Sequence, residues 1–337
     1  MASSPATPRR AATRRDDGPG LQPDAGRQRG GLAARAAPHR RSRSAGPRAA
    51  ARGAGARLRD EQLRPALPAG GDSLAGHLAH EGFEVWCTEL RAQGASQPTR
   101  GPGTFGLADL GVHDLGVAID AVLERTATRA DRVDAVGASL GATYVFMQVA
   151  WAPDHRVARM INIGGPLRWV AVHPILKVLA QAPALWGLLA IRGTRDFARR
   201  ALPLAARVPG LLHVYLHPAI CDLSEPASLV QTVDDPVPRI NQEIARWIRD
   251  RDLVLQGRDL TADLAGCELP LLTLVANADG IVPESTTCSA HNLLTGAPRT
   301  VVHAGDHRRP MAHADLFVSE PAEEQVFRPL VAWLRGG

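Results

Sequence analysis

The sequence predicts an α/β fold, built on a mostly parallel, doubly wound sheet with a helical insertion. Short apolar runs typical of buried strands alternate with amphipathic stretches, which is the pattern of a parallel sheet covered by helices on both faces. A long stretch rich in Leu, Ala, Pro and Trp interrupts this alternation and predicts several short helices. We therefore expect a core made of residues 71–166 and 266–337, with residues 167–265 forming a helical cap.

The first 70 residues differ from the rest in composition. Arg, Ala, Pro, Gly and Ser dominate them, and such a segment buries too little apolar surface to offset the entropy lost on ordering. We expect residues 1–70 to be a disordered leader. Residues 1–64 hold fifteen arginines and five acidic residues, so the remainder of the chain carries a net charge of −5. The basic character of the chain comes from the leader, and the core is not expected to bind nucleic acid.

The first half of the core begins near residue 72. Asp72 or Ser73 is expected to cap the first helix, and Gly82 to end it. The predicted elements are strands at 83–90, 132–136 and 157–163 and helices at 73–80, 113–125 and 140–151.

The cap and the second half of the core follow. In the cap we expect helices at 168–191 and 239–251. In the second half we expect strands at 270–276 and 299–303 and helices at 284–294 and 322–334.

The motif Gly137-Ala138-Ser139-Leu140-Gly141 lies between an apolar run and a stretch of small residues. This arrangement predicts a strand, a tight turn and a helix, with Ser139 in a strained conformation that exposes its hydroxyl above a helix N-terminus. Gly137 and Gly141 are expected on either side of Ser139, because side chains at these two positions would clash with the neighbouring strand and helix. The alternative is an ordinary glycine-rich turn, since the bare motif also occurs by chance.

A serine nucleophile needs a base, and the base needs a carboxylate that orients it. Asp279 follows a predicted strand, and His313 follows the last strand, so both occur in the chain order that suits a strand-turn-helix serine. Taken alone, Asp279 would equally suit a helix cap or a turn. His303 and His307 compete with His313. We expect His303 to be a packed histidine within a strand and His307 to be solvated in a polar loop.

With these motifs in place, residues 72–337 resemble a serine hydrolase of the α/β-hydrolase fold. The resemblance is to a bacterial lipase/esterase-like branch related to polyhydroxyalkanoate synthases and depolymerases. Its matching segments are 137–142, 164–167, 279–283, 313–317 and 326–334. Polyhydroxyalkanoate synthases use a cysteine nucleophile and haloalkane dehalogenases an aspartate, so Ser139 favours hydrolysis over either chemistry.

The resemblance implies an oxyanion hole built from two backbone amides. One belongs to Leu140, and the other to a His-Gly-type loop after an early strand. No apolar strand is visible before residue 72, so the early strands are apparently missing. Gly53-Ala54-Gly55 and Gly70-Gly71 are the nearest candidates for the loop, although neither follows such a strand.

The cap is rich in apolar side chains that would suit an acyl or lipid-like substrate. Trp169 and Trp186 are the candidate substrate-binding residues, although packing within the cap would explain most of this surplus. We expect a medium-chain or longer ester, thioester or lipid-like substrate.

The sequence thus predicts a carboxylic ester hydrolase with Ser139 as nucleophile, His313 as base and Asp279 as orienting carboxylate. Two alternatives stay open, which are an acyltransferase with the same triad and a catalytically impaired remnant without a complete oxyanion hole.

No cofactor or metal is implied, because the four cysteines lack metal-type spacing. Their spacing suggests no disulfide framework either, so we expect the cysteines to remain thiols in a reducing, cytoplasmic compartment. No apolar run is long enough for stable membrane insertion.

Overall fold

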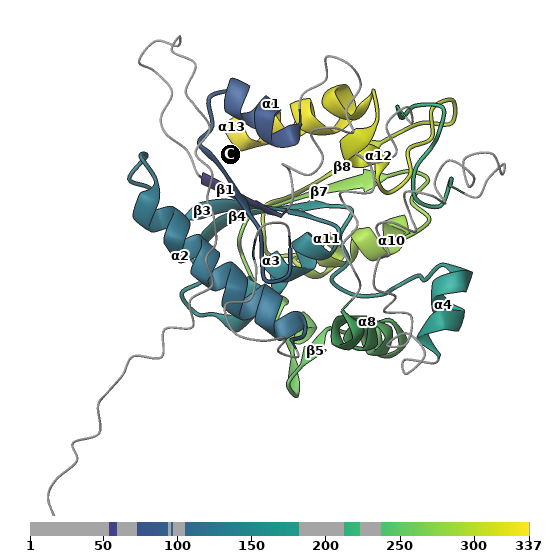
Figure 1. Cartoon of the computed structure of the whole chain (residues 1–337), viewed down its shortest axis with the longest axis horizontal. Coiled ribbons are helices and arrows are strands. Elements are labelled where there is room, and N and C mark those ends of the chain that lie inside the picture. Colours follow the sequence, from purple (N-terminus) through teal and green to yellow (C-terminus); the bar gives the residue numbers. More distant parts are fainter. Residues whose placement is uncertain are drawn as a thin grey trace, which may run out of the picture. The chain divides into compact units, whose positions relative to one another are not determined.

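A six-stranded parallel sheet, in the order β2-β1-β3-β4-β7-β8, forms the centre of the described part of the chain (Figure 1). The structure, a computed structural model, describes residues 54–58, 73–93, 96, 105–181, 212–222 and 237–336. The strands are β1 (Ala54–Leu58), β2 (Val85–Thr88), β3 (Val133–Ala138), β4 (Val157–Ile163), β7 (Leu271–Ala276) and β8 (Arg299–Ala304). The α/β fold class predicted from the sequence is confirmed.

β1 lies in a range where the sequence predicts no strand. Its backbone pairs with β2 on one side and with β3 on the other, so that Ala54 lies opposite Val133 and Arg57 opposite Val136. The sequence Ala-Gly-Ala-Arg-Leu has little intrinsic preference for strands. Backbone hydrogen bonding on both sides is what holds it in the sheet. Ala54 and Gly55, a candidate position for the oxyanion loop, are therefore strand residues, and Gly70-Gly71 lies outside the described residues.

Strands β3, β4 and β7 are buried on both faces over most of their length, which explains their nearly continuous apolar sequences. All six residues of β7 are buried, and so are the first five of β3. In β7, Leu271 joins the apolar cluster on one face, and Leu272 and Leu274 join the cluster on the other. β8 is an edge strand, and only its last residue, Ala304, is buried.

One face of the sheet is covered by helices from both ends of the described chain. They are α1 (Leu74–His80), α12 (Asp315–Val318), the π-helical turn η4 (Glu323–Phe327) and α13 (Arg328–Gly336). Ser73 caps α1 as expected, because its Oγ accepts the backbone N–H of Gly76 at 3.0 Å. α1 lies beside α13 in Figure 1, and Arg335 donates to the backbone oxygen of Glu81 at 3.0 Å. The predicted helix over 322–334 begins with the π-helical turn.

The opposite face is covered by the π-helical turn η2 (Asp109–Asp114), α2 (Leu115–Arg125), α3 (Leu140–Trp151) and α9 (Leu260–Leu264). In α2, Leu115, Ile119 and Val122 are buried at helical spacing, so this predicted helix packs one apolar face into the core. α3 is buried over most of its length, as its small and apolar sequence requires.

The helix predicted over 284–294 is two helices, α10 (Glu284–Thr287) and α11 (Ser289–Leu293), with Cys288 between them. Side chains at this junction bind the loop that follows β4. Ser289 Oγ accepts the backbone N–H groups of Leu167 and Arg168 at 3.2 and 2.9 Å, and Thr286 Oγ donates to the carbonyl oxygen of Ala171 at 2.6 Å. Ser289 Oγ also donates to the carbonyl oxygen of Thr286 at 2.6 Å, and this local bond competes with helical hydrogen bonding at the break.

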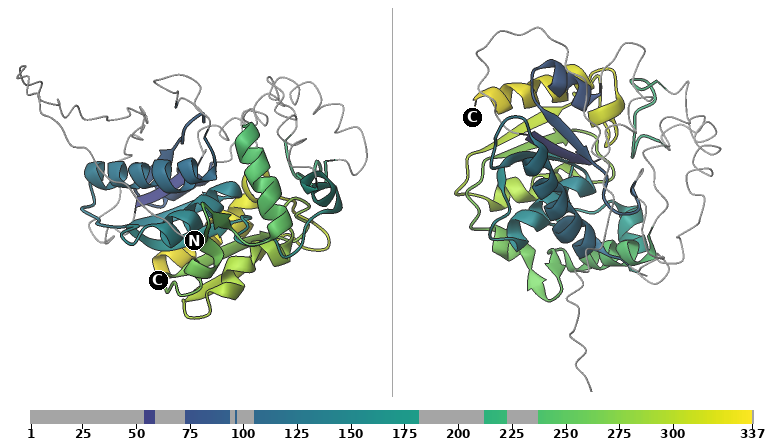
Figure 2. Two further views of the ribbon diagram at one scale, coloured as in Figure 1. Left: turned by 90° about the horizontal axis from the view of Figure 1, so that it is seen from below. Right: turned by 60° about the vertical axis from the view of Figure 1, so that its left-hand side comes forward.

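The range expected to form the cap contains α4 (Pro174–Ala180), α8 (Pro238–Asp250) and a small hairpin of β5 (Val254–Leu255) and β6 (Arg258–Asp259). α4 lies beside α8 (Figures 1 and 2). Glu243 of α8 accepts the backbone N–H of Leu107 at 2.6 Å and so joins α8 to the segment before η2. None of the helices described here is long and apolar enough to cross a membrane.

Candidate active site

Ser139 occupies the turn between β3 and α3 in a left-handed backbone conformation, with φ 50° and ψ −122°. Such a conformation is unfavourable for a residue with a side chain, and it persists only where the surroundings impose it. Two backbone hydrogen bonds do so here. Ser139 donates its N–H to Ile163 at 2.8 Å, and its own carbonyl oxygen accepts from Ala142 at 3.0 Å.

Gly137 is required by the tightness of this turn. A β-carbon there would lie 2.3 Å from the Cα of Ala142 and 2.4 Å from its backbone nitrogen, closer than atoms in proteins approach. The expectation that a side chain before Ser139 would clash with the helix is therefore confirmed at Gly137.

His313 and Asp279 lie against Ser139 in a continuous line of hydrogen bonds. His313 Nε2 is 2.9 Å from Ser139 Oγ, and His313 Nδ1 is 2.6 Å from Asp279 Oδ2. Asp279 follows β7 by three residues, and His313 lies between β8 and α12, so both leave the same edge of the parallel sheet as Ser139. The side chains of His313 and Asp279 are 7% and 1% exposed, so water barely screens their contact.

The carboxylate of Asp279 is oriented by its own loop. Its second oxygen, Oδ1, accepts the backbone N–H groups of Ile281 and Val282, both at 2.8 Å. These two donors fix the carboxylate plane and stabilise its negative charge. Asp279 Oδ2 is left to accept the Nδ1 proton of His313, which makes Nε2 the acceptor that faces the hydroxyl of Ser139.

Asn162 and Gly164 support the site, although the sequence alone does not single them out for that role. Asn162 is fully buried near the end of β4, and its amide group accepts from and donates to the backbone of Gly165 and also donates to Thr287. Gly164 has φ +65°, and a β-carbon there would lie 3.3 Å from Cε1 of His313. In the sequence, the Gly-Gly pair after β4 is the signal that could have indicated this supporting role. It allows the loop backbone to lie against the ring of His313.

The fold and this geometry match a known family. The model of that family, described as alpha/beta hydrolase fold, matches residues 63–305, more than half of the chain. The chain belongs to the alpha/beta hydrolase fold family. No match is found among curated proteins.

Solved structures share the fold of this α/β-hydrolase-fold chain at low sequence identity. A hydrolase from Pseudomonas aeruginosa is 20% identical, with a TM-score of 0.50 and coverage of 86% of this chain and 92% of that chain. An esterase from Exiguobacterium antarcticum is 14% identical, with a TM-score of 0.53 and coverage of 85% and 93%. An enol-lactonase from Burkholderia xenovorans LB400 is 14% identical, with a TM-score of 0.52 and coverage of 90% and 96%.

In this α/β-hydrolase-fold chain, a segment of the expected cap lies directly on the loops of Asp279 and His313. We call residues 212–222 the strap. The carbonyl oxygen of Val214 accepts the N–H of Gly280 at 3.1 Å, and that of Tyr215 accepts the N–H of Ala314 at 2.7 Å. The ring of Tyr215 is tilted against that of His313, with centroids 6.2 Å apart. Gly280 permits this approach, because a β-carbon there would lie 2.8 Å from the Cα of Val214.

The other candidate binding residues are placed as follows. Leu140 is the first residue of α3, where the first N–H groups of a helix have no partner within it. Trp169 is 4% exposed and packs edge-on against Trp247 of α8, with ring centroids 5.7 Å apart. Trp186 lies outside the described residues.

The competing histidines lie apart from this line of hydrogen bonds. His307 is exposed in a polar loop, as expected. His303 lies in β8, but the prediction that it is packed is wrong, since its side chain is 52% exposed and its Nε2 lies 2.9 Å from Oε1 of Glu284. The reason is its position on an edge strand, of which only the last residue is buried. Within the described residues, no group of side chains is arranged to hold a metal ion.

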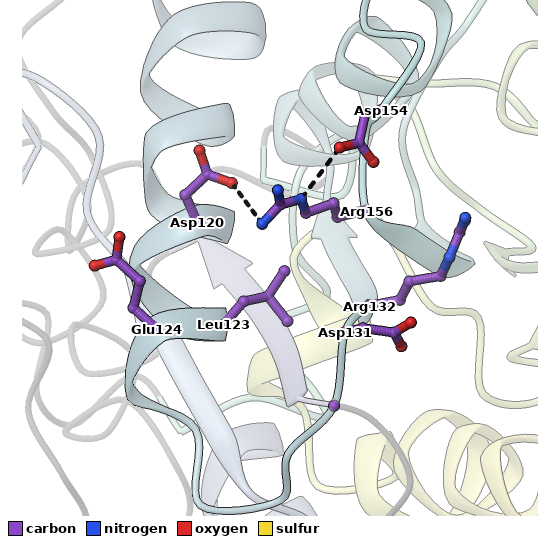
Figure 3. Close-up of a pocket in the computed structure, with 8 residues that line it drawn as sticks. Asp120, Leu123, Glu124, Asp131, Arg132, Asp154 and Arg156 are labelled. Carbon is purple, nitrogen blue, oxygen red and sulfur yellow. Dashed lines mark hydrogen bonds and ion pairs between the residues drawn. The ribbon is translucent and has the colours of Figure 1, made fainter.

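A surface hollow of about 660 Å³ lies at the other end of the sheet (Figure 3). Arg132 and Arg156, which line it, immediately precede β3 and β4, so it opens at the amino ends of these strands. Arg156 points between Asp120 and Asp154 and pairs with both, at 3.6 and 3.4 Å. These exposed ion pairs are separated from Ser139 by the full length of β3, so the hollow is no part of the candidate site.

Proposed function

We propose that the chain is a serine hydrolase that cleaves carboxylic esters, with Ser139, His313 and Asp279 as its catalytic triad. The line of hydrogen bonds from Ser139 Oγ through His313 to Asp279, which starts at a strained turn, carries this proposal. Membership of the alpha/beta hydrolase fold family supports a hydrolytic function. The names of the similar structures, an esterase and an enol-lactonase among them, agree with ester chemistry.

In the proposed mechanism, Ser139 Oγ attacks the acyl carbonyl while His313 Nε2 takes its proton. Asp279 keeps the Nδ1 proton of His313 in place and stabilises the imidazolium that forms. The N–H of Leu140 binds the oxyanion of the tetrahedral intermediate. His313 then returns the proton to the leaving alcohol. A water molecule, activated by the same nitrogen, hydrolyses the acyl-enzyme.

A second oxyanion donor is expected after β1. Arg57 lies opposite Val136, two residues before Ala138, so the chain leaves β1 at the edge of the sheet where Ser139 stands. Ala54 and Gly55 lie within β1, so Gly53-Ala54-Gly55 is no longer the position where we expect the second amide. Loss of one such donor costs about 10²–10³ in rate.

The proposed substrate is a medium-chain or longer ester, thioester or lipid-like acyl compound. The apolar composition of residues 167–265 supports this choice, with Trp169 and Trp186 as candidate contacts. We also propose a cytoplasmic location for the enzyme, because the spacing of its four cysteines suggests no disulfide framework and thiols persist in a reducing compartment. The polyhydroxyalkanoate-related branch stays the proposed subfamily, with Ser139 in place of the cysteine of the synthases.

Labelling with a fluorophosphonate probe tests the nucleophile. We expect stoichiometric labelling at Ser139, which Ser139→Ala abolishes. Ser285→Ala, which changes an exposed serine of α10, is the matched control and should label like the wild type. A folded wild-type protein that does not react with the probe would favour the catalytically impaired remnant.

A panel of p-nitrophenyl esters of increasing acyl length tests the substrate class. We expect kcat/KM to rise from acetate toward medium chains, and activity on acetate alone would contradict the proposal. Product analysis in the presence of alcohols or amines separates hydrolysis from acyl transfer, since an acyltransferase would convert most of the acyl group to the new ester or amide.

A further inference from the structure

Asp315 is a fully buried carboxylate two residues after His313, and the proposed triad does not use it. Its Oδ2 accepts, at 2.7 Å, the N–H of Ala312, which is the residue immediately before His313. Both of its oxygens lie 3.0 Å from the N–H of His217 in the strap, and Oδ1 also accepts the thiol of Cys221 at 3.0 Å. One carboxylate thus binds the loop of His313 and the strap together.

The thiol of Cys221 acts as a hydrogen-bond donor in this arrangement. Burial, and then the negative charge of Asp315, raise the pKa of the Cys221 thiol well above its usual range. The thiol therefore keeps its proton and directs it to Asp315. No side-chain cation among the described residues pairs with Asp315, so the backbone N–H groups and this thiol satisfy its charge.

The strap reaches the rest of the triad through further backbone contacts. Val214 binds the N–H of Gly280, the residue after Asp279, and Tyr215 binds the N–H of Ala314, the residue after His313. At its other end, Cys221 forms an isolated bridge with Ser319, whose hydroxyl donates to the carbonyl oxygen of Asp315 at 2.6 Å. The strap is thus fastened to the loops that present Asp279 and His313.

We propose that Asp315 is a positioning residue that clamps the strap onto the loop of His313 and thereby fixes the imidazole between Asp279 and Ser139. The proposal rests on the proposed serine hydrolase function for its catalytic consequence, whereas the clamp itself is a property of the fold. Displacement of a reacting group by about 1 Å is enough to cost 10²-fold in rate. The clamp holds the residues next to Asp279 and His313, so its loss would affect catalysis.

The first variant to test is Asp315→Asn. Both oxygens of Asp315 accept N–H donors, so the amide NH₂ of asparagine faces a donor in either orientation. We expect kcat, counted per fluorophosphonate-reactive site, to fall by about 10-fold or more while KM changes by less than about twofold. Glu320→Gln, which changes an exposed carboxylate close by, is the matched control and should leave both values unchanged.

A milder pair of variants covers the case in which Asp315→Asn fails to fold. Cys221→Ala removes one donor to Asp315, and Cys221→Ser replaces it with a hydroxyl. We expect Cys221→Ala to lower kcat per reactive site by about twofold to fivefold and Cys221→Ser to restore it. Equal kcat values in all three Cys221 proteins, with kcat also unchanged in Asp315→Asn if it folds, would overturn the positioning role.

Hydrogen–deuterium exchange tests the clamp without any reference to activity. In Asp315→Asn, or in Cys221→Ala as the milder case, exchange should accelerate together at Ala312 and Ala314 and at His217 and Gly280. Acceleration confined to residues 312–315, with the strap unchanged, would overturn the clamp. If the wild-type protein does not react with the fluorophosphonate, the proposed function fails, and the exchange result still decides whether the clamp exists.

Discussion

Gly165 packs so closely against Ser139 that a β-carbon on Gly165 would lie 2.4 Å from the carbonyl oxygen of Ser139. The same atom would lie 2.5 Å from Cβ of Ala142 and 2.8 Å from Oδ1 of Asn162. The loop after β4 and the turn after β3 therefore meet backbone against backbone. Only a glycine fits at this contact, and this close packing helps to hold Ser139 in its left-handed conformation.

Substitution of this glycine should disturb both stability and catalysis. We expect Gly165→Ala to lower the free energy of unfolding by about 1–3 kcal/mol, because the added carbon must displace backbone atoms of Ser139. The kcat for ester hydrolysis should fall with it. Gly296→Ala is the control, since a β-carbon there meets no atom within 4 Å. Urea unfolding and ester kinetics measure both effects, and equal stability of the two variants would contradict the close contact.

Asn162 should matter through the loop that it holds. Asn162→Ala removes the partners of the N–H and carbonyl groups of Gly165 and of the carbonyl of Thr287. An unsatisfied buried polar group costs about 1–3 kcal/mol, so we expect a loss of stability in that range or above it. Asn292→Ala, at an exposed position of α11, should change stability by less than about 0.5 kcal/mol. An intact unfolding midpoint in Asn162→Ala would contradict this account.

Asp279→Asn tests the electrostatic part of the proposed triad. The amide cannot stabilise the imidazolium of His313 and favours the wrong tautomer, so kcat should fall by about 10⁴-fold with little change in KM. Asp131→Asn, at an exposed position near the opposite edge of the sheet, is the matched control. A fall of less than about tenfold in Asp279→Asn would mean that another carboxylate orients His313.

His155 gives a pH dependence that is separate from catalysis. Its Nδ1 accepts the N–H of Val157 at the start of β4 at 3.0 Å, which requires an unprotonated nitrogen. Burial, and then the charge of Arg132, lower the pKa of His155 below its ordinary value of 6.5. The unfolded chain thus binds this proton more readily, so the stability from His155 is full above pH 6.5 and is lost as the pH falls through the lowered pKa.

The variant His155→Asn keeps an acceptor for Val157 but does not titrate. We expect its free energy of unfolding to fall less steeply than that of the wild type between about pH 7 and pH 5. Chemical denaturation at several pH values measures the two slopes. Identical slopes would show that protonation of His155 does not oppose folding.

Local sequence patterns predicted most of the sheet and the edge at which the candidate triad assembles. Strong apolar runs such as β4 and β7 leave little choice of structure, and the glycines around Ser139 mark a turn that few other residues tolerate. Asp279 and His313 could be placed because parallel strands all end at one edge.

Features that depend on distant partners could not be predicted in the same way. β1 has no β-branched or aromatic residue and is a strand only because two neighbours pair with it. Asp315 falls within the segment 313–317 that carries the resemblance, but its contacts depend on Cys221 and His217, almost a hundred residues earlier. His303 was misjudged because its exposure depends on β8 being an edge strand, which the order of elements along the chain does not reveal.

β1 lies between β2 and β3, so the strand with the least distinctive sequence connects the edge strand β2 to the rest of the sheet. If it were deleted, β2 would lose its hydrogen-bonded neighbour, and β3 would become an open edge with unpaired backbone groups. Open edges of this kind promote aggregation. β3 also leads into Ser139, so a shortened chain that begins after Leu58 would expose an open sheet edge and destabilise the turn of Ser139, even though every proposed triad residue would still be present.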